Sequence, residues 1–194
     1  MKTPILTNIE QFIPTLVLKN TVLFPDVQLP VLISKTIGLN AINRALEQSK
    51  DKLFVAITLK EGVTIERAAP SDFYTVGTLC TVQRIERNES GETIAHVKAL
   101  YRFKVLQIAF EESFASWVAR GEPLPDVLDL DEATETALLR SLKDISLEIL
   151  TSLNASGEFK KTLEQFDKAS DFTNLAAQNL PLILPKKQEI LEIA

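Results

Sequence analysis

The chain has one cysteine and one histidine, and this limits the chemistry that its side chains can carry. Cys80 alone cannot form a disulfide within the chain. Cys80 and His96 together are too few for a zinc site of the usual kind. A Ser-His-Asp triad would have to use His96, which alternates with Ile94, Val97 and Ala99 in a stretch typical of a strand. Because nothing in this stretch activates it, we interpret His96 as structural.

Other catalytic patterns are equally weak. No phosphate-binding loop of the form G-x-x-x-x-G-K-[ST] occurs, and the chain has only six glycines. Carboxylate pairs at 111–112 and 131–132 could serve as acid and base, but helix caps and solvated faces account for such pairs more simply. The sequence therefore predicts no enzymatic activity for this polypeptide alone, no metal and no cofactor.

Composition gives the broad class of the protein. Of the 194 residues, 45% are hydrophobic and 24% are charged, which is typical of a soluble globular protein. The longest apolar runs, such as residues 53–59, are far shorter than the ~20 residues of a membrane span. The first residues are not followed by the apolar segment of a secretory signal. We therefore expect a cytoplasmic protein that does not enter a membrane.

The charge changes along the chain. Residues 1–120 hold 14 Lys and Arg against 12 Asp and Glu, whereas residues 121–194 hold 7 against 14. The change falls at a Gly-Glu-Pro-Leu-Pro stretch, so we expect two subdomains, 1–120 and 121–194, with a linker at about 121–129. Neither half has the basic excess of a nucleic-acid binder, and we expect no nucleic-acid partner.

The first subdomain is predicted to be rich in β-structure. Residues typical of strands dominate six segments, and a turn at 88–93 makes residues 78–87 and 92–106 the arms of a long hairpin. One helix is predicted at 35–49, with an apolar stripe that would cover an open end or face of a barrel. The predicted strands are 15–18, 27–33, 53–59, 76–87, 95–110 and 114–120.

The second subdomain is predicted to be helical. The first helix would start with Asp129 as its N-cap and Glu132 at its third position, and would run for roughly 23 residues. A second piece spans 158–167, a third helix starts at Asp171 and a last one at Pro185. The last helix reaches Ala194 without a cap, so we expect the natural protein to continue. The first helix carries an apolar stripe formed by Leu138, Leu142, Ile145, Ile149 and Leu153.

Four segments together resemble the N-terminal domain of the Lon family of ATP-dependent proteases. They are "LVLKNTVLFPDVQLPVLI" (16–33), "DFYTVGTLCTVQRI" (72–85), "YRFKVLQI" (101–108) and "LAAQNLPLILPKKQEILEI" (175–193). They occur in the family's order and span nearly the whole chain. Departures include Asp26 in place of a frequent glycine after Phe-Pro, Lys19 in place of arginine, and Ala-Leu-Tyr at 99–101 in place of a frequent Glu-Gly.

The resemblance implies a fold and a role. The fold would be α+β, with an N-terminal PUA-like β pseudo-barrel that includes one helix and a C-terminal helical bundle. The role would be to engage unfolded or damaged protein substrates and to support a hexamer, while downstream domains hydrolyse ATP and cleave peptides. No serine–lysine pair with the surroundings of that family's proteolytic dyad occurs here. The alternative is a free-standing domain that acts as an adaptor. RNA binding is disfavoured, because no aromatic residues interleave with a basic stripe.

The Phe-Pro bend supplies the candidate contacts with substrate proteins. Pro25 and Asp26 interrupt an apolar stretch, so Phe24, Pro25 and Val27 could present an apolar patch, with Trp117 as a further candidate. The other interpretation places Phe24 and Val27 in the barrel core, with Pro25 only shaping the bend. Because the charge of Asp26 must reach water, one edge of the bend should lie at the surface.

Overall fold

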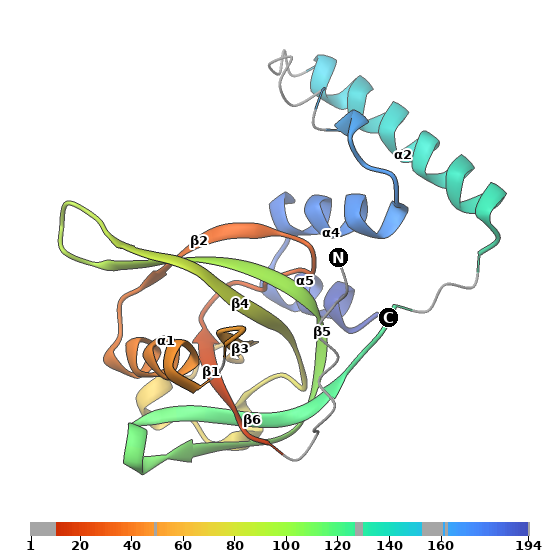
Figure 1. The fold of residues 1–194 in the computed structure, drawn as a ribbon. Helices are drawn as coiled ribbons and strands as arrows, with labels where there is room; N and C mark the ends of the chain where they lie inside the picture. The colour runs from red at the N-terminus through yellow and green to blue at the C-terminus, as the bar shows by residue number, and fades with distance from the viewer. Residues whose placement is uncertain (1–10, 49, 127–129, 153–160, 162, 194) are drawn as a thin grey trace.

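The computed structural model describes residues 11–48, 50–126, 130–152, 161 and 163–193. Six strands curl into a ring, and helix α1 (Thr36–Gln48) covers one side of it (Figure 1). The helices that follow the last strand are α2 (Glu132–Ser152), α4 (Ala169–Asn179) and α5 (Leu184–Glu192). The strands are β1 (Ile13–Leu18), β2 (Gln28–Ile33), β3 (Leu53–Thr58), β4 (Val76–Arg87), β5 (Thr93–Glu111) and β6 (Ser116–Pro123).

The long strand β5 closes the ring. The strand order is β2-β5-β4-β3-β1-β6, and a further pairing joins β5 to β6. The first part of β5 pairs with β2, and its last part pairs with β6 along the same side. All pairings are antiparallel except that of β1 with β3. One 19-residue strand therefore pairs with β4 along one edge and with both β2 and β6 along the other.

Two apolar clusters fill the ring, one on each face of the sheet. All six residues of β3 are buried, because successive side chains of a strand point to opposite faces. Phe54 and Ala56 join the cluster that contains Ile42 and Ala45 of α1. Val55 and Ile57 join the second cluster, which is built around other large side chains: Leu79, Phe103 and Trp117. Alternation along β3 thus connects the two halves of the core.

A third cluster joins the ring to the C-terminal helices. Phe24 and Val76 of the ring pack with Ala177 of α4 and with Leu184 and Leu191 of α5. Helix α2 contacts α4 through a smaller cluster, in which Leu139 packs against Ala169 and Phe172. Figure 1 shows the result: α4 and α5 lie against the ring, whereas α2 extends away from it. Among the helices in the described part of the chain, none is both long and apolar enough to cross a membrane.

The observed architecture confirms the predicted α+β class, with a six-stranded ring that holds one helix, followed by helices. The strand predicted to start at 114 begins instead at Ser116, because residues 112–114 form a short 3-10 turn, η3, that ends at Ala115 with φ 45°. Strand β6 ends at Pro123, past residue 120, and the division into two subdomains stays a prediction. Of the segment predicted at 158–167, residues 158–160 and 162 lie outside the described residues.

The start of α2 differs from its prediction by two residues. The carboxylate of Asp131 accepts a hydrogen bond from the Thr134 amide at 3.0 Å, which makes Asp131 the N-cap. Asp129, predicted as the cap, lies outside the described residues. Asp129 precedes Glu132 by three residues, and Asp131 precedes Thr134 by three residues. Either aspartate could cap the helix, so the local sequence did not distinguish them.

Candidate functional site

The side chains best able to take part in catalysis or metal binding lie apart from one another, and each has structural contacts. Cys80 is fully buried in the first core cluster, and burial raises the pKa of its thiol well above the usual range. His96 lies on β5 with its Nε2 atom 2.9 Å from Oε1 of Glu86, and Arg84 is 3.3 Å away. Within the described parts of the chain, no three His, Cys, Asp or Glu residues could together hold a metal ion.

The carboxylate pairs also have structural partners. Glu111 accepts a hydrogen bond from Arg44 at 2.5 Å, and this bond lowers the pKa of Glu111. The guanidinium of Arg44 lies 3.9 Å from the centroid of the Phe114 ring. Hydrogen bonds from Thr134 lower the pKa of Asp131 at the start of α2. These carboxylates are held ionised by neighbours that fix the ends of secondary-structure elements.

The Phe-Pro bend is a turn followed by a β-bulge. Pro25 precedes Asp26, whose φ is +63°; proline followed by a residue with positive φ is the signature of a type II turn. The Asp26 amide donates to the Ala99 carbonyl, and the Ala99 amide donates to the Val27 carbonyl. Two residues of one strand thus oppose one residue of β5, and a residue with positive φ is typical of the first bulge position. Glycine adopts this backbone conformation without strain, and Asp26 adopts it here.

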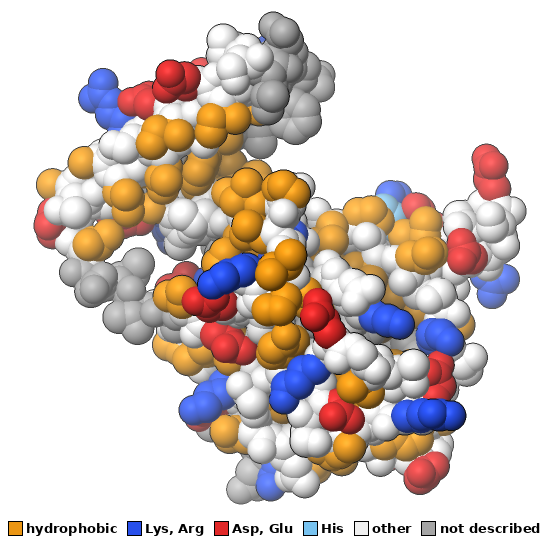
Figure 2. Space-filling view, turned by 180° about the vertical axis from the view of Figure 1, so that it is seen from behind, with side chains coloured by type: hydrophobic (Ala, Val, Ile, Leu, Met, Phe, Trp, Pro, Cys, Tyr) orange, Lys and Arg blue, Asp and Glu red, His pale blue; other side chains and the backbone are white. Residues whose placement is uncertain are grey.

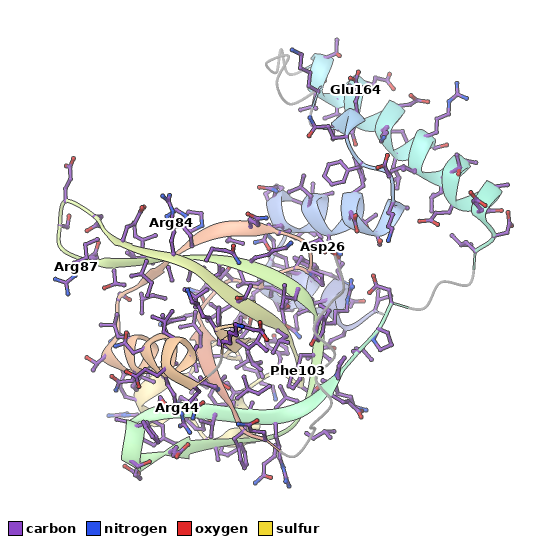
Figure 3. All side chains as sticks on the ribbon, in the orientation of Figure 1. Asp26, Arg44, Arg84, Arg87, Phe103 and Glu164 are labelled. Atoms are coloured by element: carbon purple, nitrogen blue, oxygen red, sulfur yellow. The ribbon has the colours of Figure 1, made fainter. Side chains whose placement is uncertain are left out.

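The candidate contact residues at the bend are buried. Phe24 is 0% exposed and packs between the ring and the helices α4 and α5. Its amide donates to Oε1 of Gln178 at 3.0 Å. Pro25 and Val27 are also buried, while Asp26 is exposed, as its charge led us to expect. Figure 3 shows Asp26 next to α4.

Trp117, the fourth candidate, is buried in the second core cluster. Its ring makes edge contacts with Phe73 at 4.8 Å and with Phe110 at 5.5 Å between centroids. Contact of these four residues with a substrate protein stays a prediction. In this conformation such contact requires the junction between ring and helices, or the core itself, to open.

A buried arginine fixes that junction. Arg102 of β5 donates to the Leu191 carbonyl of α5 at 2.9 Å, to Asp126 at 2.5 Å and to Asn174 of α4 at 3.2 Å. Gln188 of α5, also buried, donates to the Val76 carbonyl at 2.8 Å. Arginine suits this position because its planar guanidinium directs several donors outward at fixed angles. The helices α4 and α5 are thereby held to the ring by both polar and apolar contacts.

The largest exposed apolar feature of α2 is a line of side chains along one face, which we call the α2 stripe: Leu138, Ile145 and Ile149. They are 43%, 56% and 52% exposed. Their spacing of seven and four residues places them on one side of the helix. Leu139, which is not in the predicted stripe, makes the buried contact with α4, and Leu142 of the predicted stripe packs against the same cluster. Leu153, the last residue of the predicted stripe, lies outside the described residues. Figure 2 shows hydrophobic side chains gathered over the helical part of the molecule, while charged side chains of both signs are mixed over the ring.

Two further apolar surfaces accompany the α2 stripe. The connection between α4 and α5 exposes Leu180, Leu182 and Ile183. On the ring, a groove of about 480 Å³ lies between β1 and β2. Monomeric proteins seldom expose aligned large apolar side chains without a function in binding. These surfaces are therefore suited to contacts with other polypeptides.

Comparison with known proteins gives the family. Residues 13–194 match the model of the ATP-dependent protease La (LON) substrate-binding domain. The chain belongs to the LON substrate-binding domain family. It is 30% identical over 183 residues to Lon protease 1 of Bdellovibrio bacteriovorus, and 29% identical over 187 residues to Lon protease of Geobacter metallireducens. These matches cover 94% and 95% of this chain and 22% of each relative.

Solved structures show the same fold. The N-terminal domain of the Lon protease from the Mycobacterium avium complex aligns with a TM-score of 0.77 over 95% of this chain and 91% of that one, at 18% identity. A Lon N-terminal domain protein from Xanthomonas campestris aligns with a TM-score of 0.63 over 94% and 90%, at 17% identity. The chain thus has the fold of a LON N-domain and spans about a fifth of the length of the curated relatives it matches.

Sequence reasoning found the α2 stripe as a pattern but did not identify it as a surface. The same spacing describes a stripe that packs and one that is exposed, and the predicted stripe contained both kinds of residue: Leu142 packs beside Leu139, whereas Leu138, Ile145 and Ile149 are exposed. The role of Arg102 was also missed. A signal was present, since Arg102 lies in the segment 101–108 that carries the resemblance to the Lon family. The sequence pattern does not show, however, toward which face of the sheet a charged residue of a strand points.

Proposed function

We propose that this LON substrate-binding domain engages unfolded protein substrates through the α2 stripe. The observation that carries the proposal is the exposure of Leu138, Ile145 and Ile149 along one helix face. Unfolded chains expose apolar side chains that folded chains bury, so an apolar surface discriminates between the two states. The family description, a substrate-binding domain, supports the same role.

Binding should be weak and tolerant of sequence. A disordered chain loses conformational entropy when it is ordered, which lowers affinity per unit of buried area. A line of aliphatic side chains has no fixed hydrogen-bond requirements, so many segments of a substrate would fit. Repeated weak contacts would hold a substrate near the domain without trapping it.

The proposal is tested by binding of a disordered protein. Fluorescently labelled β-casein is titrated with the 194-residue chain, and binding is followed by anisotropy. The double variant Ile145→Ser/Ile149→Ser should bind about tenfold more weakly, because it removes apolar area that the complex would bury. Both residues are more than half exposed, so the fold should be unaffected.

A matched control changes exposed apolar residues of the ring. The variant Ile85→Ser/Leu106→Ser removes side chains that are 39% and 57% exposed, and it should bind casein like the unchanged chain. Equal affinity of the α2 variant and the unchanged chain would remove the α2 stripe from the site. No measurable binding of casein by the unchanged chain would reject the proposed function itself.

The wider role is proposed on the family relationship. Support for hexamer assembly, delivery of substrates to downstream ATPase and protease domains, and a cytoplasmic location are consistent with a chain that matches about a fifth of each Lon protease. The alternative, a free-standing adaptor with the same surface, stays a prediction. A nucleotide-binding loop encoded downstream of residue 194 in the gene would decide against the adaptor.

A further inference from the structure

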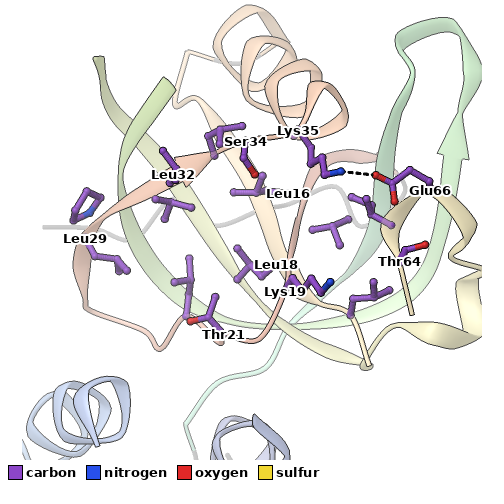
Figure 4. Close-up of a pocket in the computed structure, with 18 residues that line it drawn as sticks. Leu16, Leu18, Lys19, Thr21, Leu29, Leu32, Ser34, Lys35, Thr64 and Glu66 are labelled. Atoms are coloured by element: carbon purple, nitrogen blue, oxygen red, sulfur yellow. Dashed lines mark hydrogen bonds and ion pairs between the residues drawn. The ribbon is translucent and has the colours of Figure 1, made fainter. Parts of the chain in front are cut away.

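The groove between β1 and β2 lies where the ring lacks a strand. Strand β2 pairs only with β5, so its other edge has no partner strand among the described residues. Strand β1 pairs with β6 at residues 13–15, and on that side no strand of the described chain pairs with residues 16–18. Figure 4 shows these two strands on opposite sides of the groove. A free strand edge is a template for pairing with another chain.

The hydrogen bonds at the bulge show which backbone groups of β2 face the groove. The Val27 carbonyl accepts from Ala99 of β5, and backbone groups alternate in direction along a strand. Leu29, Val31 and Ile33 therefore direct their amides and carbonyls to β5. Gln28, Pro30 and Leu32 direct theirs to the groove.

Pro30 weakens the open edge of β2 as a template for pairing. Pro30 has no amide hydrogen, and it stands at a position that faces the open edge rather than β5, where proline is tolerated in a sheet. The edge therefore offers three carbonyls, of Gln28, Pro30 and Leu32, but only two amides. The missing amide weakens pairing of β2 with any added strand but does not prevent it.

Strand β1, on the opposite side of the groove, supplies fewer backbone hydrogen-bonding groups. The carbonyl of Leu18 accepts from the Leu59 amide, on the β3 side of β1. By alternation, the amide and carbonyl of Val17 face the groove. An inserted strand would thus be held mainly by β2 and secondarily by Val17.

The floor of the groove is apolar. Leu16, Leu18 and Ile33 belong to the first core cluster, and the half-buried Leu29 and Val31 pack against it. Side chains of a strand alternate between the two faces. An inserted strand would therefore place every second side chain on this floor and the others in solvent.

Charges differ between the two ends of the groove. Lys35 and Glu66 form a 2.9 Å ion pair near Leu16, so that end is neutralised. Lys19 is exposed beyond Leu18 at the other end (Figure 4). A strand antiparallel to β2 would bring its C-terminal end toward Lys19. An acidic residue there would be complementary to the groove.

We propose that this groove binds an extended segment of an unfolded protein as an added strand, antiparallel to β2, with apolar residues at alternate positions and an acidic residue at its C-terminal end. Strand addition of this kind takes its affinity from the backbone and its selectivity from the alternate side chains. The inference rests on the proposed function and adds to it a second, more selective surface.

The test uses a defined peptide, an acetylated heptapeptide of alternating valine and threonine that ends in glutamate. Its affinity for the 194-residue chain is measured by calorimetry, alongside two versions N-methylated at every second residue in the two possible phases. At least one phase should bind tenfold or more weakly, because methylation removes the donors that strand pairing requires and leaves the side chains in place. Equal affinity of all three peptides would overturn strand addition.

Two variants at one residue separate backbone from side chain. Leu32→Pro removes an amide that faces the groove, and it should lower peptide affinity at least fivefold. Leu32→Ser keeps the amide and removes only a side chain that is 51% exposed, so its peptide affinity should fall much less than that of Leu32→Pro. An equal loss of peptide affinity in both variants would overturn the proposal. If Leu32→Pro does not fold, the N-methylated peptides alone test strand addition.

Charge and casein binding complete the test. Lys19→Glu should weaken binding of the glutamate-ended peptide and strengthen binding of a lysine-ended one, and no change in this preference would overturn the predicted strand direction. If the unchanged chain binds casein but does not distinguish methylated from unmethylated peptides, the groove inference fails and the proposed function stands. If the chain does not bind casein, the proposed function fails.

Discussion

At the scale of single residues, Asp26 provides the positive φ of the turn, but ionisation of its carboxyl group destabilises the fold. It takes the positive φ that the Phe-Pro turn requires, a conformation that aspartate and asparagine tolerate better than most residues. Although the side chain of Asp26 is exposed, the surrounding protein partly desolvates its carboxyl group and raises the pKa, and repulsion by Asp171 and then by Asp126 raises it further. The folded chain therefore holds a proton at Asp26 more tightly than the unfolded chain does.

This shift predicts that Asp26→Asn stabilises the chain at neutral pH. Because the folded pKa is raised, the ionised carboxyl group lowers the free energy of unfolding above that pKa, and the loss disappears as pH falls toward the ordinary value of 3.8. Urea unfolding followed by Trp117 fluorescence should show a gain of about 0.5 kcal/mol at pH 7, a size typical of a screened charge interaction. The gain should vanish near pH 4.

The control for this prediction is Asp51→Asn, at another exposed aspartate in a turn. A gain of the same size and pH dependence in Asp51→Asn would show that loss of any turn carboxylate, and not the surroundings of Asp26, is the cause. A loss of stability in Asp26→Asn at pH 7, or a gain that stays constant down to pH 4, would show that repulsion at the bend is not the cause.

At the scale of elements, the close approach of β3 and β4 depends on Gly77. A Cβ atom built at this position would lie 2.4 Å from the Ala56 carbonyl oxygen. That oxygen belongs to the backbone of a strand buried on both faces, so it cannot move aside. This contact gives a physical reason for the glycine in the Val-Gly-Thr segment.

We expect Gly77→Ala to lower the free energy of unfolding by about 3 kcal/mol, the upper part of the usual range for overpacking. Gly62→Ala is the matched control, since Gly62 has φ +83° but open space around it. The control should lose only about 1 kcal/mol, the cost of a left-handed conformation. Similar losses in the two variants, measured by urea unfolding, would argue against the close contact.

At the scale of the whole molecule, the helices and the ring meet at a junction centred on Arg102. The guanidinium reaches α4, α5 and the segment before α2, with contacts to Asn174, Leu191 and Asp126. Both the α2 stripe and the groove beside β2 depend on this arrangement, because α2 is placed by α4 and the bend before β2 is covered by α4 and α5.

Arg102→Ala should therefore lower the free energy of unfolding by about 3 kcal/mol, because it leaves buried acceptors without a donor. Arg84→Ala, which removes an arginine whose side chain is 66% exposed, should change stability by no more than about 0.5 kcal/mol. Circular dichroism of the helices and Trp117 fluorescence of the ring should both follow the loss. A loss no larger than that of Arg84→Ala would show that the apolar cluster alone holds the junction.

Much of the architecture followed from local patterns. Continuous apolar residues predicted β3, the turn at 88–93 predicted the β4–β5 hairpin, and the spacing of apolar residues predicted α1 and α2. Errors fell at element ends, such as the cap at Asp131 and the start of β6 at Ser116, where alternatives one or two residues apart have similar local energies. Nothing local signals that β5 would pair with three strands.

The sequence by itself determined the elements, their order and the family, because these depend on residue types and on spacing along one segment. Only the tertiary structure decided which apolar side chains remain accessible. Phe24 at the bend is covered by α4 and α5, whereas the α2 stripe and the floor beside β2 are left open. Periodicity states that a helix or strand has an apolar face, but what covers that face depends on segments distant in the sequence.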